Sequence, residues 1–471
     1  MGNSILYYKP KTKTSLTHLA PVPGKNGKPT YPAPGTFLKT NFKTTLNAPF
    51  GMKGALNNPI AFRRLDLIRA ALECGYGRRN FWTASLALGA TEATGMRRYL
   101  HSRLEMAVSC IEINANGAWS VLPFYEKIEA SEKTALSFIF GGMGAYLVAR
   151  AWLKSGGDAL SLCLHVGIYA KGANPSLFFP IGSPDFLVHT LDKKWHVFES
   201  KGGVFTNRYS RVVEGLAQLA TMSCVCWYGD FPQTPKTAVC VHTSVDSSQE
   251  FSLVAYDPPA DHYDGDDEDD DDDEDGRNLE KGRPVKLIKG VCKLLLLLET
   301  LDQYNLMADG EKIANQPNSR EVWTFRKSVA FGGLVIGIPT RYLEHERTVR
   351  ERMAVYLSSL ETAHELLGGG IDLFRRTLIE KLRILEIPAL SPDVNGYFEQ
   401  RKLDYPNTVL DEPSDFFPGL ARVLHLDKLS EDLMIKVEES VASTLLESGR
   451  AAITSGGMYI RIQPSSTPSS G

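Results

Sequence analysis

The chain has 471 residues, of which 43% are hydrophobic, and its 52 Lys and Arg residues nearly balance its 55 Asp and Glu residues, for a formal net charge of −3. This length and composition exclude a wholly disordered or fibrous protein and predict one or two large hydrophobic cores. The longest membrane-like stretch, residues 134–149, is too short for a typical membrane span, and the N-terminus lacks the apolar segment of a signal peptide. We therefore expect a soluble cytoplasmic protein without a membrane partner.

Residues 1–60 are predicted to form a basic extended arm. They are rich in Lys, Pro, Thr, Asn and Gly and show no sustained hydrophobic periodicity. Residues 1–65 contain eight Lys and two Arg but no Asp or Glu. Such an arm can contact nucleic acid or remain a solvated tail, and both interpretations stay open.

Residues 61–128 are predicted to form an N-terminal α+β region. Helical periodicity over 63–74 and 95–108 is followed by two short apolar runs that flank Asn116-Gly117. Because Asn-Gly favours the tight turn of a β-hairpin, we expect two short paired strands here.

Residues 129–257 are predicted to form an α/β unit. The patterns indicate, in chain order, an apolar helix over 126–153, a strand over 159–170, a hairpin over 185–201, a helix from Asn207 to about Met222, and strands over 237–245 and 251–257. The turn of the hairpin is the polar segment Asp192-Lys193-Lys194.

Three charged residues of this hairpin are expected to meet. Side chains alternate between the two faces of a strand, so Glu199 and Lys201 project on one side. Asp185 opens the partner strand and can face the same spot. Two carboxylates and one ammonium at a sheet edge can hold a divalent cation and orient a water molecule against a phosphodiester.

The segments Pro184-Asp185 and Glu199-Ser200-Lys201 resemble the motif of the PD-(D/E)xK nuclease superfamily, which has the restriction-endonuclease-like fold. The resemblance covers roughly residues 130–256. It implies a core built from a helix, three strands, a helix and a strand, which is the order predicted above.

The resemblance also implies roles for these residues. Asp185 and Glu199 would bind Mg²⁺, for which Mn²⁺ can substitute, and the backbone carbonyl of Ser200 would be a further ligand. Lys201 would orient the attacking water and stabilise the transition state. A polar residue of the helix after the motif, Gln218 or Arg211, would reach the active site, or this helix face is solvated.

Three more residues are candidates for the active site or for substrate binding, and each also has a purely structural explanation. Glu132, near the start of the first helix, is a candidate acidic metal ligand, or it is a carboxylate that favours the helix dipole. Arg208 and Arg211 share one helical face with Gln218 and would contact phosphates, or they belong to a solvated face.

The predicted function is Mg²⁺-dependent hydrolysis of phosphodiester bonds in nucleic acid, with DNA as the expected partner. By analogy with other nucleases joined to helical domains, a role in bacterial defence against foreign DNA is expected. The alternatives are a catalytically inactive nuclease-like fold that binds nucleic acid or protein, and a surface hairpin with an incidental Glu–Lys pair. A further alternative is an interaction protein whose acidic run, residues 266–275, mimics DNA or recruits a basic partner.

The remaining segments follow from composition. Residues 258–280 are predicted to be a disordered linker, because they contain ten consecutive acidic residues, without which the formal charge would be +7. Residues 281–463 predict a mainly helical C-terminal domain, with helices over 285–306, 341–367 and 371–385, through which the chain could bind a partner protein or self-associate. The polar segment 464–471 is predicted to be a disordered tail.

Overall fold

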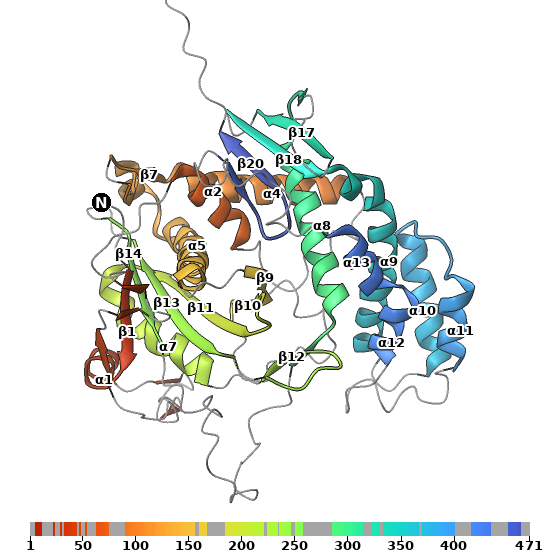
Figure 1. Ribbon diagram of the computed structural model, residues 1–471, viewed down its shortest axis with the longest axis horizontal. Coiled ribbons are helices and arrows are strands. Elements are labelled where there is room, and N and C mark those ends of the chain that lie inside the picture. Colours follow the sequence, from red (N-terminus) through yellow and green to blue (C-terminus); the bar gives the residue numbers. More distant parts are fainter. Residues whose placement is uncertain are drawn as a thin grey trace, which may run out of the picture.

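The computed structural model describes residues 5–11, 33–44, 63–74, 90–155, 160–166, 184–220, 224–257, 285–313, 322–400, 416–434 and 451–462, apart from gaps of one to four residues within these ranges, together with four two-residue strands between residues 22 and 53. The chain is a mixed α/β protein (Figure 1). A large sheet lies between helices at one side of the molecule, and a group of helices lies at the other. The acidic segment 258–280 and the tail 464–471 lie outside the described residues.

The large sheet has seven strands of mixed direction. Their spatial order is β4 (Phe42–Thr44), β1 (Ile5–Pro10), β14 (Ser252–Tyr256), β13 (Thr237–Ser244), β11 (Trp195–Gly203), β10 (Phe186–Thr190) and β9 (Leu160–His165). Strand β11 runs parallel to β13, and β1 runs parallel to β14, whereas the other neighbours are antiparallel. The elements predicted for residues 129–257 are therefore present in the predicted order.

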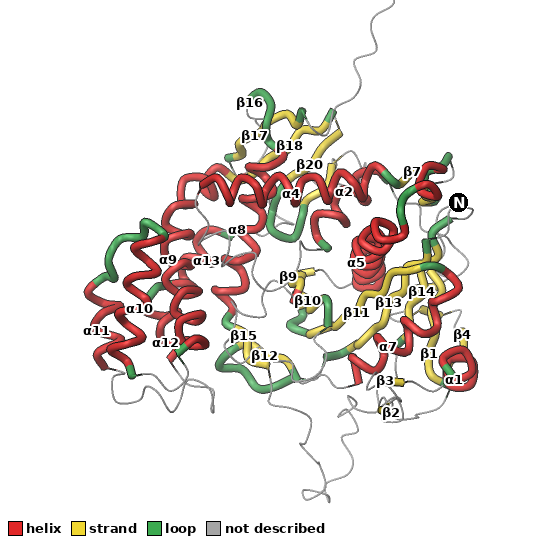
Figure 2. The backbone as a smooth tube through the Cα atoms, turned by 180° about the vertical axis from the view of Figure 1, so that it is seen from behind, coloured by secondary structure: helices red, strands yellow, loops and turns green. Residues whose placement is uncertain are grey.

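Two helices cover the two faces of this sheet. Helix α5 (Ala130–Ser155) packs on β11 and β13 from one side, and helix α7 (Arg208–Ala220) packs on the same strands from the other (Figure 2). Among the described residues, α5 is the one helix long and apolar enough to cross a membrane, but 78% of its most apolar window is buried in the protein. It is therefore the core helix that the sequence predicted.

The N-terminal residues differ from the predicted arm. Strand β1 is inserted between β4 and β14, and its residues Ile5 and Tyr7 are almost completely buried. Helix α1 (Pro34–Asn41) packs against α7, with Gly35 next to the ring of Tyr209. The prediction of an extended arm over 1–60 is wrong for these described segments, because a four-residue apolar run beginning at Ile5 was outweighed by the Lys- and Pro-rich composition around it.

The region from 61 to 128 packs on both halves of the molecule. Helix α2 (Arg64–Glu73) contacts α5 as well as strands of the C-terminal half, and α4 (Ala90–Ser109) contacts α8. Strands β7 (Ile111–Ile113) and β8 (Trp119–Val121) form the hairpin predicted from Asn116-Gly117. The left-handed φ of 78° at Gly117 shows why glycine is needed in that turn.

The C-terminal half contains a five-stranded antiparallel sheet in addition to helices. The sheet order is β16 (Lys312–Ile313), β17 (Trp323–Ser328), β18 (Leu334–Pro339), β20 (Tyr459–Ile462) and β19 (Ala451–Ile453). The helices are α8 (Lys289–Met307), α9 (Thr340–Glu365), α10 (Ile371–Ile384), α11 (Pro392–Gln400), α12 (Phe416–Val423) and α13 (Leu426–Leu433). The predicted helices are present, but the sheet was not predicted for this region, because its last two strands are more than a hundred residues from the others.

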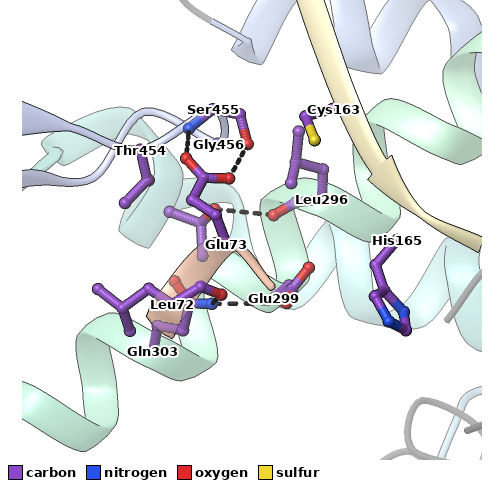
Figure 3. A pocket seen from close by; sticks show the side chains of 11 residues that line it. Leu72, Glu73, Cys163, His165, Leu296, Glu299, Gln303, Thr454, Ser455 and Gly456 are labelled. Atoms are coloured by element: carbon purple, nitrogen blue, oxygen red, sulfur yellow. Dashed lines mark hydrogen bonds between the residues drawn. The ribbon is translucent and has the colours of Figure 1, made fainter. Parts of the chain in front are cut away.

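A small polar cavity marks the contact between the two halves (Figure 3). Both carboxylate oxygens of Glu73, at the end of α2, accept hydrogen bonds from Ser455, one from its backbone N–H and one from its hydroxyl. Gln303 of α8 donates to the backbone carbonyl of Leu72 at 3.2 Å. Glu299, one turn earlier on α8, lines the same cavity. This cluster joins α2, α8 and the β19–β20 hairpin.

We expect Glu299→Gln to stabilise the protein at alkaline pH. Burial raises the pKa of Glu299 from 4.5 to about 8, and the negative charges of Glu73 and Asp302 act in the same direction. The folded-state pKa lies above the unfolded one, so this group's contribution to stability is complete below about pH 4.5 and is lost as the pH rises through 8. At pH about 9 the variant should gain about 2–4 kcal/mol in free energy of unfolding, and at pH about 5 it should match the wild type.

Urea denaturation at the two pH values measures this difference. Glu311→Gln is the matched control, because the side chain of Glu311 is 85% exposed. An equal change in stability at both pH values would contradict the assignment.

Candidate functional site

The β10–β11 hairpin brings the predicted motif residues together. The two strands pair with Phe186 opposite Phe198, so continuing the antiparallel register by one residue places Asp185 opposite Glu199. The turn is the predicted polar one, in which Lys193 has a left-handed φ of 66°. Within this turn, Asp192 and Lys194 form an ion pair with each other at 2.7 Å.

Asp185 is held in place by Ser200. Its Oδ2 accepts a hydrogen bond from the backbone N–H of Ser200 at 2.8 Å and from the Ser200 hydroxyl at 2.6 Å. Its backbone carbonyl accepts from the N–H of Val166, next to strand β9, at 2.9 Å. The carboxylate therefore has a defined orientation at the point where three strands meet.

Glu199, Lys201 and Gln218 form a hydrogen-bonded chain between the sheet and α7. The ammonium of Lys201 donates to Glu199 Oε1 and to Gln218 Oε1, each at 2.5 Å. Helix α7 can approach this closely because it has a glycine at 215: a Cβ atom there would lie 2.5 Å from Cys240 Sγ and 3.3 Å from side-chain atoms of both Glu199 and Lys201. The predicted reach of Gln218 to the site is therefore present in the geometry.

Burial makes this group of charges electrostatically unusual. Glu199 is 1% exposed, and burial raises its pKa to about 8, with the charge of Asp185 acting in the same direction and Lys201 opposing it. Burial alone would lower the pKa of Lys201, but Glu199 and Asp185 raise it, so the ammonium stays protonated at neutral pH. A buried acid with a strongly raised pKa next to a charged partner is typical of functional sites.

One carboxylate oxygen of Glu199 is placed where it could bind a cation. Oε2 is buried and has no hydrogen-bond partner among the described residues. A buried acceptor without a donor costs about 1–3 kcal/mol, and a bound cation would satisfy it. The carboxylates of Asp185 and Glu199 together are a donor set that suits Mg²⁺, which binds one or two carboxylates and completes its shell with water and substrate oxygens.

The described part of the chain contains no group of three or more His, Cys, Asp or Glu side chains placed to hold a metal ion. Glu132 therefore forms no such group with Asp185 and Glu199. Glu132 is exposed in the first turn of α5, where its Oε2 accepts a hydrogen bond from the backbone N–H of Glu129 at 3.3 Å. The structure thus places Glu132 as a helix-capping carboxylate and not beside Asp185 and Glu199.

Ser200 contributes differently from the expectation drawn from the resemblance. Its N–H and hydroxyl both orient Asp185, as described above, which is a role that the sequence did not indicate. The use of its backbone carbonyl as a ligand stays a prediction.

The two arginines of α7 have different surroundings. Arg208 donates to the hydroxyl of Tyr209 at 2.7 Å, and its guanidinium lies over that ring, 4.5 Å from the centroid. Arg211 has a side chain that is 53% exposed and pairs with Glu214 at 3.1 Å. Arg211 is therefore accessible to a phosphate, whereas Arg208 belongs to an aromatic cluster.

A neighbour that sequence reasoning missed is His242 of β13. It pairs directly with Lys201 in the parallel β11–β13 ladder and is fully buried. Nothing local in β13 shows that this strand lies next to Lys201. Only the strand pairing could have identified it.

Comparison of the chain with models of known protein families, with curated proteins and with solved structures gives no match. A function for the chain must therefore be argued from the geometry of its own residues.

Proposed function

We propose that the chain is a Mg²⁺-dependent nuclease that hydrolyses phosphodiester bonds in DNA. The observation that carries the proposal is the convergence of Asp185, Glu199 and Lys201 at one end of a hairpin, with a buried oxygen of Glu199 left without a partner among the described residues. The order of elements around the hairpin, α5, β9, β10, β11, α7 and β13, supports a restriction-endonuclease-like core. The resemblance of the motif is independent support, because it was identified from residues and not from packing.

Each side chain has a role that its contacts support. Asp185 and Glu199 would hold Mg²⁺, which when bound neutralises developing negative charge and lowers the pKa of the attacking water. Ser200 keeps Asp185 in one orientation. Lys201, fixed by Glu199 and Gln218, donates a proton of its ammonium in a hydrogen bond to the attacking water or to the phosphoryl oxygen on which charge develops.

The substrate's backbone would pass beside α7. Arg211 is exposed near the start of this helix and can neutralise a phosphate. Cleavage should therefore weaken as salt increases. DNA releases bound cations when the protein binds, and the free-energy gain from this release becomes smaller at high ionic strength.

Plasmid cleavage tests the proposal. We expect the full-length chain to cut plasmid DNA with Mg²⁺ or Mn²⁺ but not with EDTA, and we expect Asp185→Asn to lose this activity. The matched control is Asp192→Asn in the turn of the same hairpin, which should cut normally because its ion pair with Lys194 lies away from the site.

Three results would contradict the proposal: no cleavage with either metal, cleavage that persists in EDTA, or equal activity of Asp185→Asn and the wild type. A parallel reaction with single-stranded RNA shows whether the sugar matters. If RNA is cleaved faster, the substrate is RNA and not DNA, and the proposed chemistry is the same.

A further inference from the structure

A cavity of about 230 Å³ lies on α7's side of the large sheet, between that helix and strands β1, β13 and β14. Three tyrosines line it, Tyr8, Tyr209 and Tyr256, together with Arg208 and His242. The volume is below the roughly 300–1,000 Å³ of pockets that take drug-sized ligands. The cavity is therefore suited to one small ring system and is too small for a larger ligand.

The cavity lies on the same face of the sheet as the side chain of Lys201. Lys201 pairs with His242, and His242 pairs with Val254, so these three side chains lie in one row on the same sheet face. A second row runs from Glu199 to Tyr256 through Cys240. Neighbouring strands are about 5 Å apart, so the cavity begins about 5–10 Å from Lys201.

The tyrosines and the arginine offer flat surfaces. The rings of Tyr8 and Tyr256 are stacked, with centroids 4.5 Å apart and planes 8° from parallel. The guanidinium of Arg208 donates a hydrogen bond to the hydroxyl of Tyr209 and lies 4.5 Å from the centroid of the same ring. Aromatic rings and guanidinium planes are the surfaces on which proteins stack the bases of a single strand.

His242 forms part of the cavity wall, but its side chain is completely buried, and its Nε2 lies beside Gly203 of β11. Its Nδ1 contacts the hydroxyl of Ser244 at 3.1 Å, whereas its Nε2 is buried without a partner in the part of the chain that the structure describes. Burial lowers the pKa of His242 to about 4, and the charges of Arg208 and Arg211 act in the same direction, so the ring is neutral. Among the residues that line the cavity, Arg208 is then the one that carries a charge.

We propose that this cavity holds a single nucleobase of the strand whose backbone lies at Lys201. The proposal rests on the proposed function for the identity of the strand. The base would leave its own stack and contact the tyrosines, with one edge toward the guanidinium of Arg208. The unstacking costs a few kcal/mol, which the aromatic contacts offset.

Binding to intact and abasic strands tests the cavity without requiring cleavage. Fluorescence anisotropy in EDTA compares a labelled single-stranded oligodeoxynucleotide with a counterpart that has the same backbone but no bases. The wild type should bind the intact strand about tenfold more tightly or better. Two variants should remove most of this difference and leave abasic binding unchanged: Tyr209→Leu, which deletes a stacking ring, and Ser252→Phe, which fills the cavity from β14.

Tyr99→Leu is the matched control, because Tyr99 is 65% exposed on α4 and should not affect either strand. Equal binding of intact and abasic strands by the wild type would overturn the proposal, as would variants that weaken both strands alike. Base-dependent binding without cleavage in Mg²⁺ would support the assignment of the cavity and contradict the proposed nuclease activity. Cleavage without base-dependent binding would do the reverse.

Discussion

Replacing Lys201 with Met should reduce Mg²⁺-dependent cleavage by about two to three orders of magnitude while the protein remains folded. Methionine keeps much of the length and volume of the lysine stem but removes the ammonium that contacts Glu199 and Gln218. Without it, no described cation remains at hydrogen-bond distance from Glu199 to stabilise charge on the phosphoryl group. Initial rates of plasmid cleavage measure the loss.

The matched control for this variant lies in the same hairpin. Lys194 is in the turn and its side chain is 47% exposed, so Lys194→Met removes an equal charge from the chain without touching the site. Its cleavage rate should stay within a factor of about two of the wild type, because exposed ion pairs contribute little. A Lys201→Met enzyme as active as Lys194→Met would remove Lys201 from the mechanism.

Gly202→Ala tests the close contact between β11 and α5. We expect this variant to lower the free energy of unfolding by about 3 kcal/mol and to abolish activity. A Cβ atom at this position of β11 would lie 1.8 Å from the backbone carbonyl oxygen of Ser137 in α5. Backbone atoms cannot rotate away as a flexible side chain can, so α5 would have to move off the strand. Because Lys201 precedes Gly202, this movement would displace the ammonium as well.

The next residue supplies the control. A Cβ atom on Gly203 would meet only His242 Nε2, at 3.7 Å, which is an ordinary van der Waals distance. Urea denaturation should therefore show a large loss of stability for Gly202→Ala and little for Gly203→Ala. Equal midpoints for the two variants would show that α5 and β11 are not in the close contact described.

Burying the charged residues of this site lowers the stability of the protein. Glu199 sits almost fully buried with one oxygen lacking a donor among the described residues, and burial raises its pKa. A well-packed apolar residue would avoid this cost, since a buried charge pair is seldom a net gain over hydrophobic packing. Retaining two carboxylates and an ammonium here is therefore consistent with a functional requirement.

Local sequence patterns were sufficient to predict the individual strands and turns of the site. The strand alternation that ends in Glu199 and Lys201, the polar turn at Asp192-Lys193-Lys194 and the hairpin at Asn116-Gly117 are all present in the structure. These features depend on turn chemistry and side-chain alternation within a few residues, which sequence patterns describe directly. The motif residues were found for the same reason.

The contacts between elements that are distant in the sequence became known from the packing of the folded chain. Helix α7 brings Gln218 to Lys201, strand β1 brings Tyr8 beside Tyr256, and the β19–β20 hairpin joins strands more than a hundred residues away. Glu132 had the right chemistry but lies at an exposed helix start. Such pairings follow from which apolar faces can be buried together across the whole chain, and no local pattern contains that information.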